Sequence, residues 1–133
     1  MYDHPSAAEL IAAARMQLEQ LVIPSISEPR LRFQTLVAAN VLAIVERELA
    51  GGQVYLAAAW RRAADLQGDP AAMPDSTTLH AAVAAQAQQL CADIRAGVYD
   101  REPQRQALLA HLQRTAEEEL LVANPRFLDR MQR

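Results

Sequence analysis

The sequence predicts an all-α fold, a compact bundle of about five helices followed by a short C-terminal helical turn. Three observations predict it. Of the 133 residues 51% are hydrophobic, but many are Ala and only 5% are aromatic, a composition that suits closely packed helices. Apolar residues recur with the helical period over five segments. Gly and Pro residues fall between those segments, where they favour turns.

The longest segment, 31–49 (LRFQTLVAANVLAIVEREL), contains neither Gly nor Pro, and we expect the bundle to be organised around it. On a helix its apolar residues form two neighbouring stripes. The first stripe consists of Leu31, Ala38, Leu42, Val45 and Leu49, and the second stripe of Phe33, Val37, Val41 and Ile44. Together they cover roughly half of the circumference, which is wide for a surface helix. We therefore expect a central helix over 30–50 with both stripes in the core, stopped by Gly51-Gly52.

The helix before this segment is predicted from signals at both of its ends. Ser6 and Glu9 have the spacing of a capping box, in which each residue bonds the backbone N–H of the other. Pro24 pushes the residue before it out of the α region. The sequence therefore predicts a first helix over 7–22 that ends at Pro24.

Three further helices follow the central one, and turn residues delimit them as well. They are predicted over 53–66, 77–96 and 104–123. Gly68 and Gly97 suit left-handed C-caps, and Asp75 or Ser76 suits the N-cap of the fourth helix. The loop at 67–75 is a link and not a domain boundary, because neither side of it is large enough for a separate core. We expect one helical-bundle domain over 1–133.

The last long helix, over 104–123, is predicted to turn one apolar face inward. That face consists of Leu108, Leu109, Leu112, Ala116, Leu120 and Ala123. Asn124-Pro125 breaks the helix, and a final turn over 126–131 is expected to pack back on the bundle.

Composition excludes several classes of function. A net charge of −3 and a pI near 5.6 argue against nucleic-acid binding, which needs a basic surface. No apolar run approaches the roughly 20 residues that span a bilayer, and the N-terminal MYDHPSAAEL lacks the features of a signal peptide. We expect a cytoplasmic protein that does not bind membranes. The single cysteine, Cys91, allows no internal disulfide and is expected to be buried and inert.

No catalytic, cofactor-binding or metal-binding motif stands out. The three histidines, His4, His80 and His111, lie outside the spacings of zinc and di-iron sites and are expected to be solvated. All 13 basic residues are Arg, so no Lys is available as a Schiff-base nucleophile or phosphate-loop ligand. The acidic run Glu117-Glu118-Glu119 is expected to form a solvated face. We expect no catalytic residue, no metal and no cofactor in this chain.

Residues of the central helix that core packing does not explain are candidates for contact with a partner protein. Asn40 interrupts the apolar pattern; it is either a boundary residue bonded to a neighbouring helix or a polar key that fixes register or meets a partner chain. Arg30 and Arg32 stand at the N-terminal end of the helix, where the dipole disfavours cations. They either extend into solvent or meet an acidic or phosphate group of a partner.

Two further groups complete the set of interface candidates. Glu46, Arg47 and Glu48 end the central helix and form either a solvated charge cluster or an interface. Tyr55 and Trp60 lie beside Arg61-Arg62 on the third helix and combine the residue types enriched at interface hot spots. The alternative for the two rings is partial packing in the core.

The central segment also carries a resemblance to a known family. Residues 30–49, RLRFQTLVAANVLAIVEREL, resemble the hallmark stretch of a small bacterial all-helical family of unknown function. Residues 5–10 (PSAAEL), 90–100 (LCADIRAGVYD) and 108–128, ending ANPRFL, also fit that family. The region 53–87 departs most from it.

The resemblance implies a partner protein. Members are encoded beside an aminoglycoside-phosphotransferase-like kinase and an acyl-CoA dehydrogenase. They are similar to the small subunit of a two-component kinase that phosphorylates a 4-hydroxyacyl-CoA with ATP in levulinate catabolism. The kinase chain would hold the ATP, the Mg²⁺ and the catalytic base, and the resemblance transfers no catalytic residue to this chain.

Three interpretations follow. In the first, the chain is a non-catalytic accessory subunit that binds and activates or stabilises such a kinase. In the second, it is a self-associating module that forms a homodimer through the wide face of the central helix. In the third, it is an enzyme or ligand-binding bundle with a pocket lined by Asn40, Arg47 and Glu48.

Overall fold

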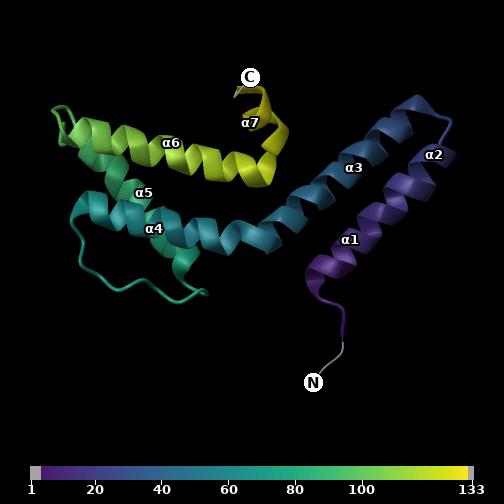
Figure 1. Cartoon of the computed structure of the whole chain (residues 1–133), viewed down its shortest axis with the longest axis horizontal. Helices are drawn as coiled ribbons and strands as arrows, with labels where there is room; N and C mark the ends of the chain where they lie inside the picture. The colour runs from purple at the N-terminus through teal and green to yellow at the C-terminus, as the bar shows by residue number, and fades with distance from the viewer. Residues whose placement is uncertain (1–3, 132–133) are drawn as a thin grey trace. The chain divides into compact units, whose positions relative to one another are not determined.

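The computed structural model describes residues 4–131 and shows an all-α protein with no strand in that range (Figure 1). The helices are α1 (Ala7–Gln17), α2 (Ile23–Ser25), α3 (Pro29–Arg47), α4 (Gln53–Gln67), α5 (Leu79–Arg95), α6 (Gln104–Ala123) and α7 (Pro125–Met131). Two π-helical segments, η1 (Leu18–Val22) and η2 (Glu48–Gly52), follow α1 and α3. The predicted fold class is confirmed, and α7 is the predicted C-terminal helical turn.

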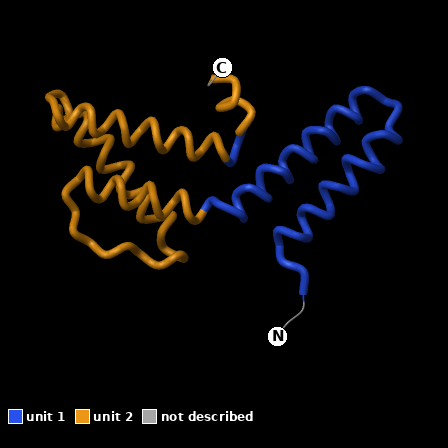
Figure 2. Tube along the Cα trace, in the orientation of Figure 1, with its two compact units in different colours: residues 1–52, 122–124 blue, residues 53–121, 125–133 orange. Residues whose placement is uncertain are grey.

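The helices fall into two compact units, which Figure 2 colours separately. Among the described residues, unit 1 comprises 4–52 and 122–124, and unit 2 comprises 53–121 and 125–131. Unit 1 therefore holds α1 to η2, and unit 2 holds α4, α5, most of α6, and α7. The single domain over 1–133 stays a prediction.

Unit 1 is a helical hairpin in which α1 packs along α3. The predicted capping box is confirmed at the start of α1. The Glu9 amide donates to Ser6 Oγ at 3.2 Å, and the Ser6 amide donates to Glu9 Oε2 at 2.7 Å. The backbone hydrogen bond from Ser6 lowers the pKa of the Glu9 carboxyl. Two N–H groups that a helix terminus would otherwise leave unbonded are thus satisfied.

The prediction that the first helix ends at Pro24 is wrong. The chain stays helical through η1 and α2 to Ser25, and Ile26 is the first extended residue. In η1 the Ile23 amide bonds the carbonyl of Leu18, five residues back, so the turn is wider than an α-turn. Pro24 then falls in the first turn of α2, where its missing N–H leaves no hydrogen bond unmade.

The prediction that Gly51-Gly52 stops the central helix is also wrong. The helix widens into η2 and leads directly into α4. The chain's glycines with positive φ are Gly68 and Gly97, so neither residue of the Gly51-Gly52 pair serves as a left-handed cap. Gly52 is buried, and the carboxylate of Glu48 lies where a Cβ atom would stand. A glycine is needed at position 52 because the Glu48 side chain approaches the backbone closely there, and not because the chain turns.

Unit 2 contains two clusters of buried side chains. Trp60, Ala64 and Leu79 join α4 to the start of α5, and Leu90, Tyr99 and Leu108 join α5 to α6. Gly68 (φ +67°) and Gly97 (φ +79°) follow α4 and α5, which confirms both predicted C-caps. Asp75 accepts the amides of Thr77 and Thr78 at 3.1 and 3.0 Å in the turn before α5. The N-cap of α5 is Thr78, whose side chain makes no capping bond, so the predicted cap at Asp75 or Ser76 is wrong.

Burial of α3 differs from expectation. Only Ala39 of this helix is buried, and most of both apolar stripes is exposed. The reason is the number of neighbours: α1 covers one side of α3, and the two stripes together are wider than one partner helix can cover. The prediction that both stripes lie in the core is therefore wrong.

Candidate functional site

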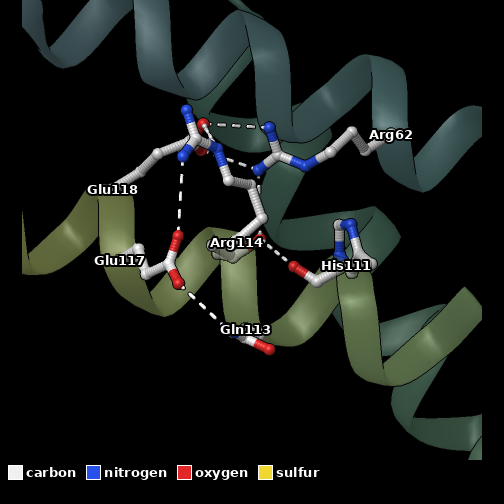
Figure 3. Close-up of polar contacts among 7 residues, drawn as sticks. Arg62, His111, Gln113, Arg114, Glu117 and Glu118 are labelled. Atoms are coloured by element: carbon white, nitrogen blue, oxygen red, sulfur yellow. Dashed lines mark hydrogen bonds and ion pairs between the residues drawn. The ribbon is translucent and has the colours of Figure 1, made fainter. Parts of the chain in front are cut away.

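The most elaborate polar site in the described structure lies in unit 2, where α4 and α6 are joined by a buried ion pair (Figure 3). Glu118 is only 4% exposed. Arg62 donates from Nη1 to Glu118 Oε1 at 3.0 Å and from Nη2 to Glu118 Oε2 at 2.6 Å. This bidentate geometry gives a stronger and more directional contact than a single bond from an ammonium group.

Two further side chains of α6 complete the site. Arg114 Nε lies 3.2 Å from Glu118 Oε1. The Arg114 side chain is more exposed than that of Arg62. Thr115 Oγ1 accepts from Arg62 Nη2 at 3.3 Å and donates to the carbonyl of His111 at 2.9 Å. Both carboxylate oxygens therefore face guanidinium donors, and the Thr115 hydroxyl is held within the site.

His111 borders this site and is half-buried. Its Nδ1 atom and Arg62 Nε are buried without a hydrogen-bond partner among the described residues. Burial lowers the pKa of His111, the positive charge of Arg62 lowers it further, and Glu118 opposes the shift. The neutral imidazole is thus the favoured form inside unit 2.

The helical register of α6 explains why polar residues are buried there. Leu108, His111, Thr115 and Glu118 follow one another at intervals of three or four residues and so share one side of the helix. The predicted inward face is wrong, because Leu109 and Leu112 are exposed. Expected solvation of Glu118 and of His111 is wrong as well. The missed signal is the periodic alignment of these polar residues with the buried Leu108.

The arrangement has the chemistry of a structural ion pair. Removing both charges from water is costly, and the cost is offset only when geometry is good and the remaining lone pairs are bonded. Arg62 and Arg114 meet that condition around Glu118. The site therefore links α4 to α6 through side chains. None of its residues was among the predicted interface candidates.

Unit 1 has its own ion pairs, which involve one predicted interface residue. Glu46 on α3 accepts from Arg15 on α1, and Arg15 also donates to Glu19 at 2.9 Å. The hydrogen bond to Glu46 is the main cause of a raised pKa of Arg15. Glu46 thus joins α1 to α3 within the hairpin. The prediction of a solvated charge cluster at residues 46–48 did not include this contact.

The other charged candidates on α3 have separate environments. Arg47 Nε donates to the carbonyl of Val122 at 2.6 Å, and both residues belong to unit 1. Arg30, Arg32 and Glu48 are exposed. The Arg30 backbone amide, and not its side chain, bonds Glu28, which caps α3.

Asn40 and the two rings complete the comparison. Asn40 is exposed, so its amide needs no partner inside the hairpin. Tyr55 is half-buried, and Trp60 is 7% exposed within its core cluster, as the core-packing alternative describes. The structure brings none of the eight candidates together in one pocket, and their contact with a partner stays a prediction.

Other predicted features have these positions. Cys91 is exposed, so the prediction of a buried thiol is wrong. Within residues 4–131, no group of three or more His, Cys, Asp or Glu side chains is placed to hold a metal ion. Across the same described part of the chain, no helix combines the length and apolarity that crossing a bilayer requires.

Comparison with known proteins assigns the chain to a family. No curated protein and no solved structure matches the chain. One family, described as a domain of unknown function (DUF6285), matches residues 24–127, which is more than half of the sequence. The match includes the whole of α3 and of the Arg62–Glu118 site. The chain therefore belongs to the DUF6285 family.

Proposed function

We propose that this chain is a non-catalytic accessory subunit that binds an aminoglycoside-phosphotransferase-like kinase acting on hydroxyacyl-CoA, and activates or stabilises it. The partner is suggested by the resemblance of residues 30–49 to the small subunit of such a kinase. In this proposal the kinase chain holds ATP, Mg²⁺ and the catalytic base. Because the reaction uses ATP and a CoA thioester, the proposal also places the pair in the cytoplasm.

The observation that supports binding to another protein is the exposed apolar surface of α3. Leu31 and Leu49, at the ends of the first stripe, are each about half exposed, at 49% and 50%. Contiguous apolar surface of this kind is typical of protein–protein interfaces. Within unit 1, α1 covers one side of α3 and leaves this surface exposed. We propose that the first stripe is the docking surface for the kinase.

Co-expression with the kinase encoded in the neighbouring gene tests the proposal. We expect the two chains to co-purify and the phosphorylation rate, or the kinase lifetime, to rise. Leu31→Asp should abolish co-purification, because it places a charge in the desolvated contact. Leu109→Asp is the matched control, since Leu109 is 58% exposed and lies in unit 2.

The outcomes separate clearly. Absence of co-purification together with an unchanged phosphorylation rate would overturn the proposal. Equal loss of binding with Leu31→Asp and with Leu109→Asp would show that the first stripe is not the docking surface. Circular dichroism of each variant must match that of the unsubstituted chain for the comparison to hold.

A second candidate function is self-association as a homodimeric helical module. It is favoured by the second stripe, in which Phe33, Val37 and Val41 are 66%, 46% and 50% exposed. These residues lie on a different side of α3 from Leu31 and Leu49, so the two candidates use different surfaces. Light scattering on the isolated chain tests this candidate, and a monomer at every concentration would exclude it.

A further inference from the structure

The side of α3 that faces away from α1, continued by the first residue of η2, carries six residues at alternating intervals of four and three. This α3 seam consists of Arg30, Gln34, Val37, Val41, Ile44 and Glu48. The opposite side of the helix bears the buried Ala39 and the Arg15–Glu46 pair, through which α3 packs on α1. Alternating intervals of three and four are those of a coiled-coil seam, in which the contact residues stay on one line.

We infer that a second copy of this chain docks on the α3 seam with its α3 helix antiparallel to the first, which rests on the self-association candidate. The intervals four, three, four, three, four read the same in both directions. The seam can therefore pair with itself about a two-fold axis at the level of Ala39, as an isologous interface requires. In that register Val37 of each copy meets Val41 of the other, at the centre.

Charge at the two ends of the seam selects this orientation. Arg30 and Glu48 are 18 residues apart, which is roughly 27 Å along a helix. In the antiparallel dimer Arg30 of each copy meets Glu48 of the other, giving two opposite-charge pairs. In a parallel dimer Arg30 would meet Arg30 and Glu48 would meet Glu48, which like-charge repulsion disfavours. Both residues are exposed, and neither side chain has a hydrogen bond or ion pair with another described residue.

The remaining seam positions fit between these ends. Gln34 of each copy meets Ile44 of the other, where the aliphatic stem of the glutamine covers the isoleucine and the amide stays at the rim. Phe33 and Val45 lie beside the seam, on opposite flanks of it, and each adds apolar surface at the margin of the contact. The apolar side chains thus occupy the centre and the charged ones the ends, as in a typical protein interface.

The exposed area indicates a weak dimer. A fully exposed Val or Ile side chain presents roughly 60–120 Å² of apolar surface, and a Phe side chain roughly 150–250 Å². Phe33, Val37, Val41 and Val45 are between 36% and 66% exposed, and with the half-buried Ile44 they offer roughly 200–350 Å² per copy. A stable interface buries about 800 Å² per partner, of which somewhat more than half is apolar. The dimer therefore lies at the transient end, and we expect it to form as the chain concentration rises from micromolar toward about 1 mM.

Sedimentation equilibrium of the full chain over that concentration range tests the dimer and its orientation together. Arg30→Glu and Glu48→Arg each place like charges at both ends of the antiparallel seam. Each is expected to raise the dissociation constant about 2- to 30-fold, since two exposed pairs are reversed. The double variant restores opposite charges and should recover the original constant. Arg32→Glu is the matched control, because it changes the net charge by the same amount as Arg30→Glu. Arg32 is exposed and lies off the seam.

Disulfide formation tests the register. In chains that carry Cys91→Ser, which removes the exposed native thiol, we expect a mixture of Val37→Cys and Val41→Cys chains to cross-link faster than either chain alone. A monomer at every concentration overturns both this inference and the self-association candidate. A dimer whose dissociation constant is unchanged by Arg30→Glu and Glu48→Arg, and which shows no preference for the mixed disulfide, overturns this inference alone. Neither result bears on co-purification with the kinase, which tests the first stripe.

Discussion

Replacement of Arg62 by Leu is the sharpest test of the buried site in unit 2. It removes the two hydrogen bonds to Glu118, at 3.0 and 2.6 Å, and the bond to Thr115 at 3.3 Å. The Glu118 side chain is 5% exposed, so it stays desolvated with Arg114 as its remaining charged partner. Removing one member of a buried pair costs about 3–5 kcal/mol, and we expect the lower end because Arg114 remains.

Urea unfolding followed by far-ultraviolet circular dichroism measures this loss. Arg61→Leu is the control, because Arg61 is the neighbouring arginine and is exposed; its effect should stay within about 0.5 kcal/mol. The double variant Arg62→Leu with Glu118→Leu should be more stable than Arg62→Leu alone, since it leaves no unpaired buried charge. An Arg62→Leu chain within about 0.5 kcal/mol of the unsubstituted chain would refute the reasoning.

Three smaller predictions concern single groups. Because burial lowers the pKa of His111 from its ordinary 6.5, the unfolded chain binds that proton first as pH falls. When the pH falls through the ordinary histidine pKa of 6.5, the His111→Gln chain should therefore lose less stability than the unsubstituted chain. Equal losses in the two chains, measured by urea unfolding at each pH, would contradict this. Gly97→Ala should lower the free energy of unfolding by about 1–2 kcal/mol, and by at least as much as Gly68→Ala does. A Cβ atom at position 97 would stand 2.9 Å from Asp100 Oδ2, whereas a Cβ atom at position 68 would meet open space. A larger loss for Gly68→Ala in unfolding experiments would contradict this prediction. Ser6→Ala should cost about 1 kcal/mol, seen as faster hydrogen exchange in the first turn of α1, and unchanged exchange would speak against the capping box.

Features that depend on a few neighbouring residues could be predicted from the sequence. The Ser6–Glu9 capping box and the left-handed glycines at Gly68 and Gly97 each involve a short stretch of chain, so local chemistry is sufficient. The α6 helix was predicted with the bounds that the structure shows. The α class follows from the same local preferences summed over long segments.

The two wrong helix ends have one physical cause. Just before Pro24, and at Gly51-Gly52, the helix widens into a π-helical segment and does not break. A π-turn contains one residue more than an α-turn, and such turns are so rare that residue preferences do not predict them. The sequence therefore predicts a helix C-cap at Gly51-Gly52, whereas in the structure Gly52 makes room for the side chain of Glu48.

The faces of the helices could not be predicted, because they depend on distant partners. Glu118 is buried only because Arg62, 56 residues earlier, supplies two hydrogen bonds. Glu46 meets Arg15, 31 residues earlier. Polar residues on a helix ordinarily indicate the solvent side, so a sequence interpretation places Glu118 outside. For the interface candidates, the sequence left open whether residues such as Arg30 and Asn40 meet solvent, a neighbouring helix or a partner, because that too depends on groups distant in the chain.

The burial of Trp60 has a spectroscopic consequence. It is the only tryptophan of the chain and lies in the core of unit 2. Its fluorescence therefore reports the melting of unit 2 alone, whereas far-ultraviolet circular dichroism reports the helices of both units. Coincident transitions in the two signals mean one cooperative unfolding event, and separate transitions mean two. A chain with one tryptophan thus carries its own measure of whether residues 1–133 behave as a single domain.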